Sequence, residues 1–390
     1  MRMYLLTIKI QSVLVAIVLI LQEVHSFRWL GINSTLVDES DDADLRRYLC
    51  SSSPTASKNR LLNKEQKKIC RQNVKMMKYV VTAVELARTE CLRLSEFERW
   101  DCTGILQAPK FPKDLRVGTR EAAFLRALSS AALVFAVTQR CATDGVCDCG
   151  KQPRRSLLKR HKRKNPGWKY AYGGCHDNIA VGTKFSIDFL DGHEIRQTKH
   201  NDRKLTKLHN NDLGRKIVRN SLSLDCKCHG LTGACSIHTC TRFLPLEFSL
   251  IAKKIFELYK KALQVELIYV GEAKKELVIK KKKQGEKQKK LKSNDMAYLL
   301  KLRDFCVPET KNKLPGTKGR ACGHKFIGNF KTAPFVNTTA INVCDHLCCK
   351  RGYSTTTRNT PRLCRCKFDM KIMDVKCKTC ILRKEIYLCR

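Results

Sequence analysis

Acidic residues are scarce in this chain: 36 Asp and Glu stand against 76 Lys and Arg, which gives a formal net charge of +40 over 390 residues. A cationic surface of this strength attracts polyanions, namely nucleic acid, anionic lipid or the sulfated sugars found outside cells. The charge by itself excludes none of these partners. The choice among them depends on the compartment in which the protein works.

Long apolar runs are scarce as well. The run from Val13 to Leu21 is shorter than the roughly 20 residues that a membrane-spanning helix needs. It follows the basic residues Arg2 and Lys9, so it favours a secretory signal peptide over residues 1–26, cleaved just before Phe27, and disfavours a signal anchor. Because no later segment is apolar enough to span a bilayer, we expect a secreted chain that is soluble unless it is lipidated.

Motifs of common hydrolases are missing too. The sequence contains no Gly-x-Ser-x-Gly, no His-Glu-x-x-His and no paired carboxylates in a plausible pocket motif. We therefore expect no enzyme activity, no catalytic residue and no bound cofactor or metal.

Cysteine, by contrast, is abundant. The chain has 22 cysteines, and all of them follow the predicted cleavage site, where an oxidising compartment would pair them. Glycosylation sequons at Asn33 and Asn337 agree with export, although a random chain of this length often holds one or two. Export and oxidised cysteines together exclude nuclear binding of nucleic acid, which the lysine-rich run at 280–290 would otherwise suggest.

The expected polyanion is then an extracellular one. Outside the cell the abundant polyanions are sulfated glycosaminoglycans, so the charge indicates retention in the extracellular matrix by heparan sulfate proteoglycans. The basic run from Lys274 to Lys292 is the candidate contact. A second basic stretch, 154–164, is compatible with a sugar-binding loop or with cleavage by a convertase at 160–163.

Apolar residues recur at helical spacing in four stretches. The first, Lys64 to Leu94, has Lys and Arg on its other face and predicts an amphipathic helix. Glu121 to Arg140 is apolar almost all round, so it predicts the buried central helix of the domain. Ile179 to Phe189 and Phe248 to Ala262 outline two further helices. Several helices of this length can enclose one core, and we place this helical domain at 27–270.

The rest of the chain cannot form such a core. The run Lys274 to Lys292 has the composition of a solvated linker, which we place at 271–300. Beyond it, the segment from Cys306 to Cys389 contains ten cysteines and hardly any apolar run. A segment of this kind has to be held by disulfides. We therefore predict a separate cysteine-rich domain at 301–390.

The most informative segment, 226–240, reads CKCHGLTGACSIHTC. Cysteines two positions apart point to the same face of an extended strand, so Cys226 and Cys228 can each bond to a partner on a returning strand. Nested pairing then joins Cys228 to Cys235 and, outside that bond, Cys226 to Cys240. The segment predicts a disulfide-closed β-hairpin.

The tip of this hairpin carries an apolar side chain beside a hydroxyl, Leu231 and Thr232. Gly230 and Gly233 supply the backbone freedom that a tight tip requires. In a reducing compartment the same cysteines and the neighbouring histidine would suggest a tetrahedral zinc site or a Cys and His nucleophilic pair. The signal peptide argues against both, because a sulfur in a disulfide neither ligates zinc nor attacks a substrate.

The segment resembles the signature Cys-x-Cys-His-Gly-x-Ser-Gly-x-Cys of the Wnt family, and the similarity runs over nearly the whole mature chain. Further Wnt-like stretches follow in the order that the family shows. They are FERWDC at 97–102, GTREAAFLRALSSAALVFAVTQRC at 118–141, GWKYAYGGC ending at Cys175, KLHNNDLGRK around His209, and CDHLCCKRGY at 344–353. This many motifs in the family's order make the resemblance specific.

The resemblance implies a disulfide-rich α+β fold. A helical N-terminal domain carries a protruding β-hairpin "thumb", and a small cysteine-stapled C-terminal domain carries a β-hairpin "index finger". It also implies disulfide pairs, namely Cys91–Cys102, Cys141–Cys147, Cys149–Cys175, Cys306–Cys349, Cys322–Cys344, Cys348–Cys389, Cys364–Cys380 and Cys366–Cys377. Cys50 and Cys70 then remain and would pair with each other.

The resemblance further implies a function: a secreted, lipid-modified ligand that binds Frizzled cysteine-rich domains and so triggers Wnt signalling in development, cell fate or polarity. A palmitoleate-type acyl chain is expected on Thr232. The implied partners are a lipoprotein-receptor-related or receptor-tyrosine-kinase co-receptor, a membrane acyltransferase and a Wntless-type carrier. The implied receptor-binding residues are Leu231, Thr232, Phe368, Met370, Ile372 and Met373.

This chain departs from the family at both hairpin tips. Thr232 stands where the family has its acylated serine. The extra methyl group of threonine makes its hydroxyl a poorer acceptor of the fatty acyl group. The alternative is that Thr232 is a threonine of the turn that carries no lipid. The index finger lacks the family's adjacent cysteines, and between Cys366 and Cys377 it reads KFDMKIMDVK. Without that rigid bridge we expect weaker or differently selective receptor contact.

Another class of protein shares the compartment, the charge and the disulfides. It is a secreted basic growth factor or matrix protein that binds sulfated sugar and carries no lipid. Acylation at Thr232 and high affinity for a Frizzled domain distinguish the two.

Overall fold

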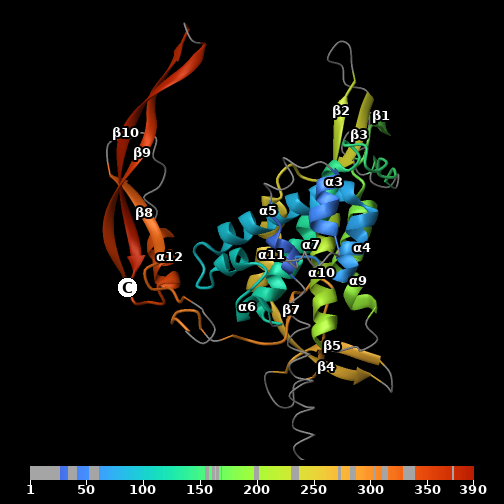
Figure 1. Ribbon diagram of the computed structural model, residues 1–390, viewed down its shortest axis with the longest axis horizontal. Coiled ribbons are helices and arrows are strands. Elements are labelled where there is room, and N and C mark those ends of the chain that lie inside the picture. The colour runs from blue at the N-terminus through green and yellow to red at the C-terminus, as the bar shows by residue number, and fades with distance from the viewer. Residues whose placement is uncertain are drawn as a thin grey trace, which may run out of the picture. The chain divides into compact units, whose positions relative to one another are not determined.

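The computed structural model describes residues 27–33, 42–51, 61–116, 118–153, 158–159, 163, 167, 169–196, 202–229, 237–270, 274–281, 287–302, 304–309, 315–327, 339–370 and 373–390. The chain divides into two compact units (Figure 1). The first comprises Met1–Arg93 and Thr103–Leu302, and the second comprises Leu94–Cys102 and Arg303–Arg390. The predicted signal peptide lies outside the described residues.

The core of the first unit is helix α7 (Arg120–Arg140), which is buried along almost its entire length. Thr119 caps its start by accepting a hydrogen bond from the backbone N–H of Ala122 (3.1 Å). The helix is apolar and long enough to cross a membrane, but its apolar window is fully buried in the protein. The prediction of a buried central helix over 121–140 is confirmed.

Three helices pack against α7. They are α9 (Ile179–Arg196), α10 (Asp202–Asn220) and α11 (Ser249–Lys260). α9 and α11 match the helices predicted from apolar spacing, whereas α10 is too polar for that signal. Its buried polar side chains have partners instead: Arg215 forms an ion pair with Asp191 of α9 (2.8 Å), and both side chains are almost fully buried.

The amphipathic stretch predicted as one helix over 64–94 is interrupted. It forms α4 (Lys64–Gln72), a 3-10 turn η3 (Val74–Met76) and α5 (Met77–Ser95). Asn73 leaves the helical conformation, with φ −137° and ψ 56°, and its side-chain amide donates to the carbonyl of Ile69. Asn63 and Gln66 form a capping box at the start of α4.

The chain ahead of α4 packs on the same body. It comprises the 3-10 turn η1 (Arg28–Gly31), α3 (Asp42–Leu45) and the π-helical turn η2 (Arg46–Cys50). Trp29 is fully buried, and its ring meets that of Phe189 edge-on at 5.8 Å. Shorter elements, η4 (Cys102–Gln107) and α6 (Lys113–Arg116), lead into α7.

The basic segment after α11 is a sheet. Strands β4 (Leu263–Val270), β5 (Lys274–Ile279), β6 (Lys289–Lys290) and β7 (Ala297–Tyr298) form one sheet in the order β6-β5-β4-β7. Val265 and Val278 are buried on it, and Asn210 of α10 holds β7 through two hydrogen bonds to Ala297. The prediction of a solvated linker over 271–300 is therefore wrong for β5, β6 and β7, because they pair within this sheet and Val278 of β5 is buried.

The second unit contains a three-stranded sheet and a helix. The strands are β8 (Ala321–Ile327), β9 (Tyr353–Asp369) and β10 (Asp374–Cys389), in the order β8-β10-β9, and the helix is α12 (Thr339–Leu347). Its small core consists of one leucine and disulfide sulfur, namely Leu347 with Cys322, Cys344, Cys348 and Cys389. The predicted cysteine-stapled domain is present.

This unit also includes the loop Leu94–Cys102, which the sequence placed in the helical domain. The guanidinium of Arg320 explains the difference. It donates four hydrogen bonds of 2.9–3.3 Å to backbone carbonyls of this loop, those of Ser95, Glu96, Glu98 and Arg99. The planar fork of arginine suits several acceptors at once.

Close contact between α7 and α10 leads to a stability prediction. A Cβ on Gly214 of α10 would overlap the carbonyl oxygen of Ala127 and the hydroxyl of Ser130, whereas a Cβ on Gly192 of α9 would meet nothing within 4 Å. Gly214→Ala should therefore destabilise the protein by about 1–3 kcal/mol or more, as overpacking does.

The matched control is Gly192→Ala, which should be neutral or stabilise by up to about 1 kcal/mol, because alanine is the better helix former. Denaturant unfolding with the disulfides intact measures both changes. Equal effects of the two substitutions would contradict the α7–α10 packing.

Candidate functional site

The first hairpin is formed by β2 (Ser223–Cys228) and β3 (Ile237–Phe243), which pair antiparallel with Cys226 opposite Cys240. These two cysteines form a disulfide, and Cys228 is also disulfide-bonded. Figure 1 shows this hairpin leading away from the helices of the first unit. The predicted tip, with Leu231, Thr232 and Cys235, lies outside the described residues.

A third strand supports this hairpin. β1 (Lys169–Tyr172) pairs parallel to β3, with Tyr170 beside His238, and their rings stack at 4.9 Å. The hydroxyl of Thr241 donates to the carbonyl of Gly173 (2.7 Å). β1 and these contacts fall in the GWKYAYGGC stretch, so one Wnt-like motif serves as the platform for the other.

The base of the hairpin is held by two residues that follow this motif directly. Nδ1 of His176 accepts the backbone N–H of Arg242 (3.0 Å), and the carboxylate of Asp177 accepts that of Leu244 (2.7 Å). Burial raises the pKa of Asp177, against the effect of its hydrogen bond. Sequence reasoning missed both residues, although their position immediately after Cys175 was available as a signal.

His176 should make the hairpin base sensitive to acid. Its ring is buried, and because Nδ1 accepts a hydrogen bond, the neutral ring carries its proton on Nε2. Burial, followed by the positive charge of Arg242, lowers the pKa of His176 below its ordinary value of about 6.5. The unfolded chain therefore binds this proton more tightly. The stability contributed by His176 is full above pH 6.5 and is lost as the pH falls through 6.5 toward the lowered pKa.

His176→Asn tests this prediction, since the asparagine carbonyl can replace Nδ1 as acceptor without titrating. The loss of unfolding free energy between pH 7.5 and pH 5.0 should be smaller in His176→Asn than in the wild type. His229→Asn, which alters an exposed side chain, should keep the wild-type pH dependence. If the pH dependence of the unfolding free energy is the same in His176→Asn as in the wild type, His176 is not the cause of the acid sensitivity.

The second hairpin is formed by β9 and β10 and is crossed by two disulfides, Cys364–Cys380 and Cys366–Cys377. Large apolar side chains near its end are exposed: Phe368 is 54%, Met370 77% and Met373 73% accessible. The predicted contact residue Ile372 lies outside the described residues. The hairpin thus exposes an apolar end without the adjacent cysteines of the family.

The other disulfides join the pairs that the resemblance implied. They are Cys50–Cys70, Cys141–Cys147, Cys149–Cys175, Cys306–Cys349, Cys322–Cys344 and Cys348–Cys389. Cys91 and Cys102 are each disulfide-bonded as well. No cysteine of the described chain is free, so the sulfur clusters around Cys322 and Cys306 offer no thiolate to a metal ion.

The same reasoning excludes the zinc alternative at the first hairpin, where Cys226, Cys228 and Cys240 are all oxidised. The structure describes only one of the two predicted glycosylation sites. Asn33 is exposed, and Asn337 lies outside the described residues.

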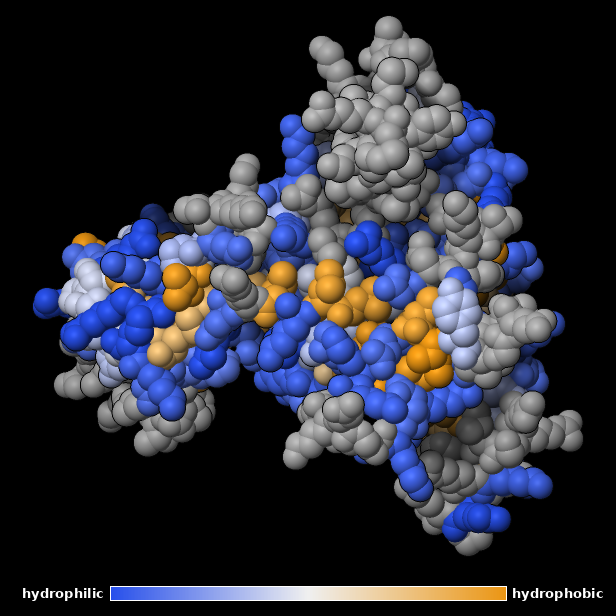
Figure 2. All heavy atoms as spheres, turned by 90° about the horizontal axis from the view of Figure 1, so that it is seen from below, coloured by the Kyte–Doolittle hydropathy of each residue, from blue (hydrophilic) through white to orange (hydrophobic). Residues whose placement is uncertain are grey.

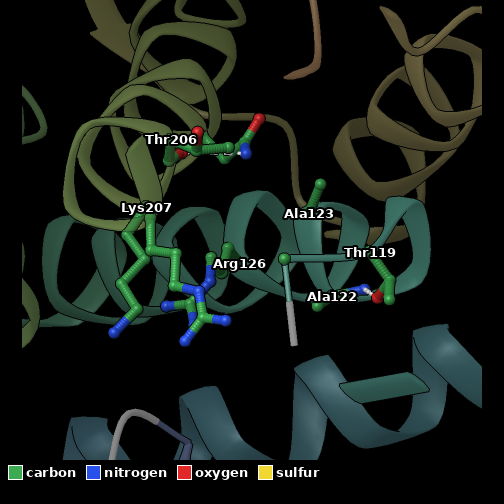
Figure 3. Close-up of a pocket in the computed structure, with 9 residues that line it drawn as sticks. Thr119, Ala122, Ala123, Arg126, Thr206 and Lys207 are labelled. Carbon is green, nitrogen blue, oxygen red and sulfur yellow. Dashed lines mark hydrogen bonds between the residues drawn. The ribbon is translucent and has the colours of Figure 1, made fainter. Parts of the chain in front are cut away.

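A pocket between α7 and α10 has a polar lining (Figure 3). It contains Thr119, Ala122, Ala123 and Arg126 from α7 and Thr206 and Lys207 from α10. Lys207 forms an ion pair with Glu194 (3.1 Å); burial alone would raise the pKa of Glu194, but the ammonium outweighs it and lowers this pKa. No carboxylate, histidine or cysteine is among the described lining residues.

Fold and site together define a class of protein: an α+β, disulfide-stapled chain that carries crosslinked hairpins, one of them with an exposed apolar end. A family model described as the Wnt family matches residues 58–390, and the chain therefore belongs to the Wnt family. The members of this family are signalling ligands.

One solved structure agrees with this assignment, and a second gives a weaker match. A chain in the structure of human WLS in complex with WNT8A is 27% identical, with a TM-score of 0.52, and the alignment covers 80% of this chain and 94% of that chain. The N-terminal domain and linker of Drosophila WntD is 18% identical, with a TM-score of 0.37, and the alignment covers 59% of this chain and 98% of that one. We draw nothing further from the second similarity.

Proposed function

We propose that the protein is a secreted, lipid-modified Wnt ligand that binds the cysteine-rich domain of Frizzled receptors to trigger signalling in development, cell fate or polarity. The observation that carries the proposal is the crosslinked β9–β10 hairpin with Phe368, Met370 and Met373 exposed at its end. Exposed apolar side chains on a rigid support are typical of protein contacts. The proposed contact also includes Leu231, Thr232 and Ile372.

The lipid is proposed to sit on Thr232, at the tip of the β2–β3 hairpin, and to enter an apolar groove of the receptor. Each methylene buried contributes about 0.8 kcal/mol, so a dozen contribute on the order of 10 kcal/mol before ordering costs. A membrane acyltransferase would attach the chain. The similarity to a structure of WLS in complex with WNT8A supports a carrier of the WLS type during secretion.

Removal of the hydroxyl tests the lipid. Thr232→Ala should nearly abolish binding to an isolated Frizzled domain, and the acyl mass should disappear from the tryptic peptide that contains position 232. Thr232→Ser should keep both and raise the acylated fraction, since serine lacks the obstructing methyl group. Wild-type binding by Thr232→Ala, or a wild-type peptide without acyl mass, would instead favour an unlipidated matrix-binding factor.

Heparan sulfate proteoglycans are proposed to retain the ligand in the extracellular matrix, and a co-receptor of the lipoprotein-receptor-related or receptor-tyrosine-kinase type to complete the signalling complex. The support for retention is the β5–β6 region, where Lys280, Lys281, Lys289 and Lys290 are all exposed. Hydrophilic residues also predominate on the face in Figure 2. Cations this close together act jointly, because charges within a Debye length of about 8 Å are not screened from one another.

Glutamine at these four lysines should lower the salt concentration that elutes the protein from heparin, since each sulfate contact releases counterions. Affinity for an isolated Frizzled domain should not change. The control carries glutamine at four scattered exposed lysines, Lys64, Lys75, Lys110 and Lys113, and should elute close to the wild type. Equal shifts in the two variants would mean that net charge, and not this sheet, governs retention.

A further inference from the structure

The β9–β10 hairpin exposes more apolar surface than its end. Val375 lies opposite Phe368, Thr379 opposite Leu363, and Ile381 opposite Pro361. Four of these side chains are large, apolar and exposed: Phe368 (54%), Val375 (55%), Leu363 (66%) and Ile381 (75%). We call this set, with the Cys366–Cys377 bridge between its two halves, the shaft face.

A β-bulge brings the two halves of the shaft face to the same side. On β10, Val375, Cys377, Thr379 and Ile381 are spaced by two and share one face. The register shifts between Lys376 and Lys378 of β10, where the single residue Cys377 faces two residues of β9, Arg365 and Cys366. Arg365, with φ 49°, is the extra residue. Without it the side chain of Leu363 would lie on the face opposite Phe368.

Charge is segregated to the other face of the ribbon. Lys367 pairs with Lys376, and Lys378 pairs with Cys364, so these lysines alternate with the shaft face, and all three are exposed. The described members of the shaft face carry no charge. From Val375 to Ile381 of β10 the hairpin is therefore an amphipathic ribbon, apolar on one side and cationic on the other.

The shaft face continues a surface that is covered at the base of the hairpin. The same alternation continues along β10 from Ile381 through the exposed Arg383 and through Glu385 to Tyr387 and Cys389. Tyr387 and Cys389 pack with Tyr353 in the cysteine core of the second unit. Beyond this core the apolar face has no covering layer among the described residues. A sheet face of this kind is normally buried against a second layer.

We propose that the shaft face docks the same face of a second copy of this chain. Two sheets packed face to face lie about 10 Å apart, so the lysines of each copy would point outward, separated by more than the Debye length of about 8 Å. A two-fold axis near the Cys366–Cys377 bridge would set Phe368 of one copy near Ile381 of the other, which makes the surface self-complementary.

The association should be weak. Four exposed side chains per copy bury on the order of 1,000 Å² in total, at the low end of specific interfaces. We therefore expect dimers at high local concentration, such as a heparan sulfate surface would create. The inference goes beyond the proposed receptor binding and does not depend on the lipid.

Sedimentation velocity over a range of concentrations tests the dimer, with Thr232→Ala as the background so that an acyl chain cannot cause association. We expect a reversible monomer–dimer equilibrium whose dissociation constant rises at least tenfold in Leu363→Lys/Ile381→Lys. Leu246→Lys, at a side chain that is 87% exposed in the first unit, is the control and should dimerise like the background. All three sites are exposed, so circular dichroism should show intact folds.

A second measurement locates the contact. A photo-crosslinking benzoylphenylalanine in place of Ile381 should link to β9 or β10 of another copy. A monomer at every concentration, a dimer unaffected by the double substitution, or crosslinks to other elements would overturn the proposal. Loss of Frizzled binding in Leu363→Lys/Ile381→Lys of the acylated protein, without any dimer, would assign the shaft face to the receptor instead.

Discussion

Cross-strand disulfides are the constraint on which both hairpins depend. A two-stranded ribbon that projects beyond its core has no second layer to bury its apolar residues, and alone it is marginally stable in water. The bond Cys226–Cys240 joins directly opposed positions of β2 and β3, and the bond Cys366–Cys377 joins β9 to β10 at their register shift. A disulfide contributes roughly 2–4 kcal/mol, largely by restricting the unfolded chain. Apolar contact residues can therefore stay exposed on ribbons that remain folded.

The helical unit gives the first hairpin a fixed base. Helix α7 is buried because its neighbours approach closely, and Gly214 of α10 lies against its backbone. From this body the chain leads to β1, whose pairing with β3 and the hydrogen bonds of His176 and Asp177 hold the hairpin from one side. Packing in the core and hydrogen bonds at the base thus hold the described part of the first hairpin in place.

Alternation along a β-strand places charged and apolar side chains on opposite faces. In the β9–β10 ribbon one face carries Leu363, Phe368, Val375 and Ile381, while the other carries Lys367, Lys376 and Lys378. Exposed apolar and cationic side chains then lie on separate faces of the same ribbon. A net charge of +40 is compatible with protein contacts because it is kept off those faces.

The sequence by itself determined the features that rest on local spacing: the helices at 121–140, 179–189 and 248–262, the cysteine-closed hairpin and the family motifs. Only the tertiary structure decided the features whose partners are far apart in the chain. The polar helix α10 is stable because Arg215 meets Asp191, and the loop at 94–102 joins the second unit because Arg320, over 200 residues later, binds its carbonyls. The spacing of residues along the chain predicts which face of a helix or strand each side chain occupies. The partner that offsets the cost of burying a charge or a carbonyl group comes close only when the chain has folded.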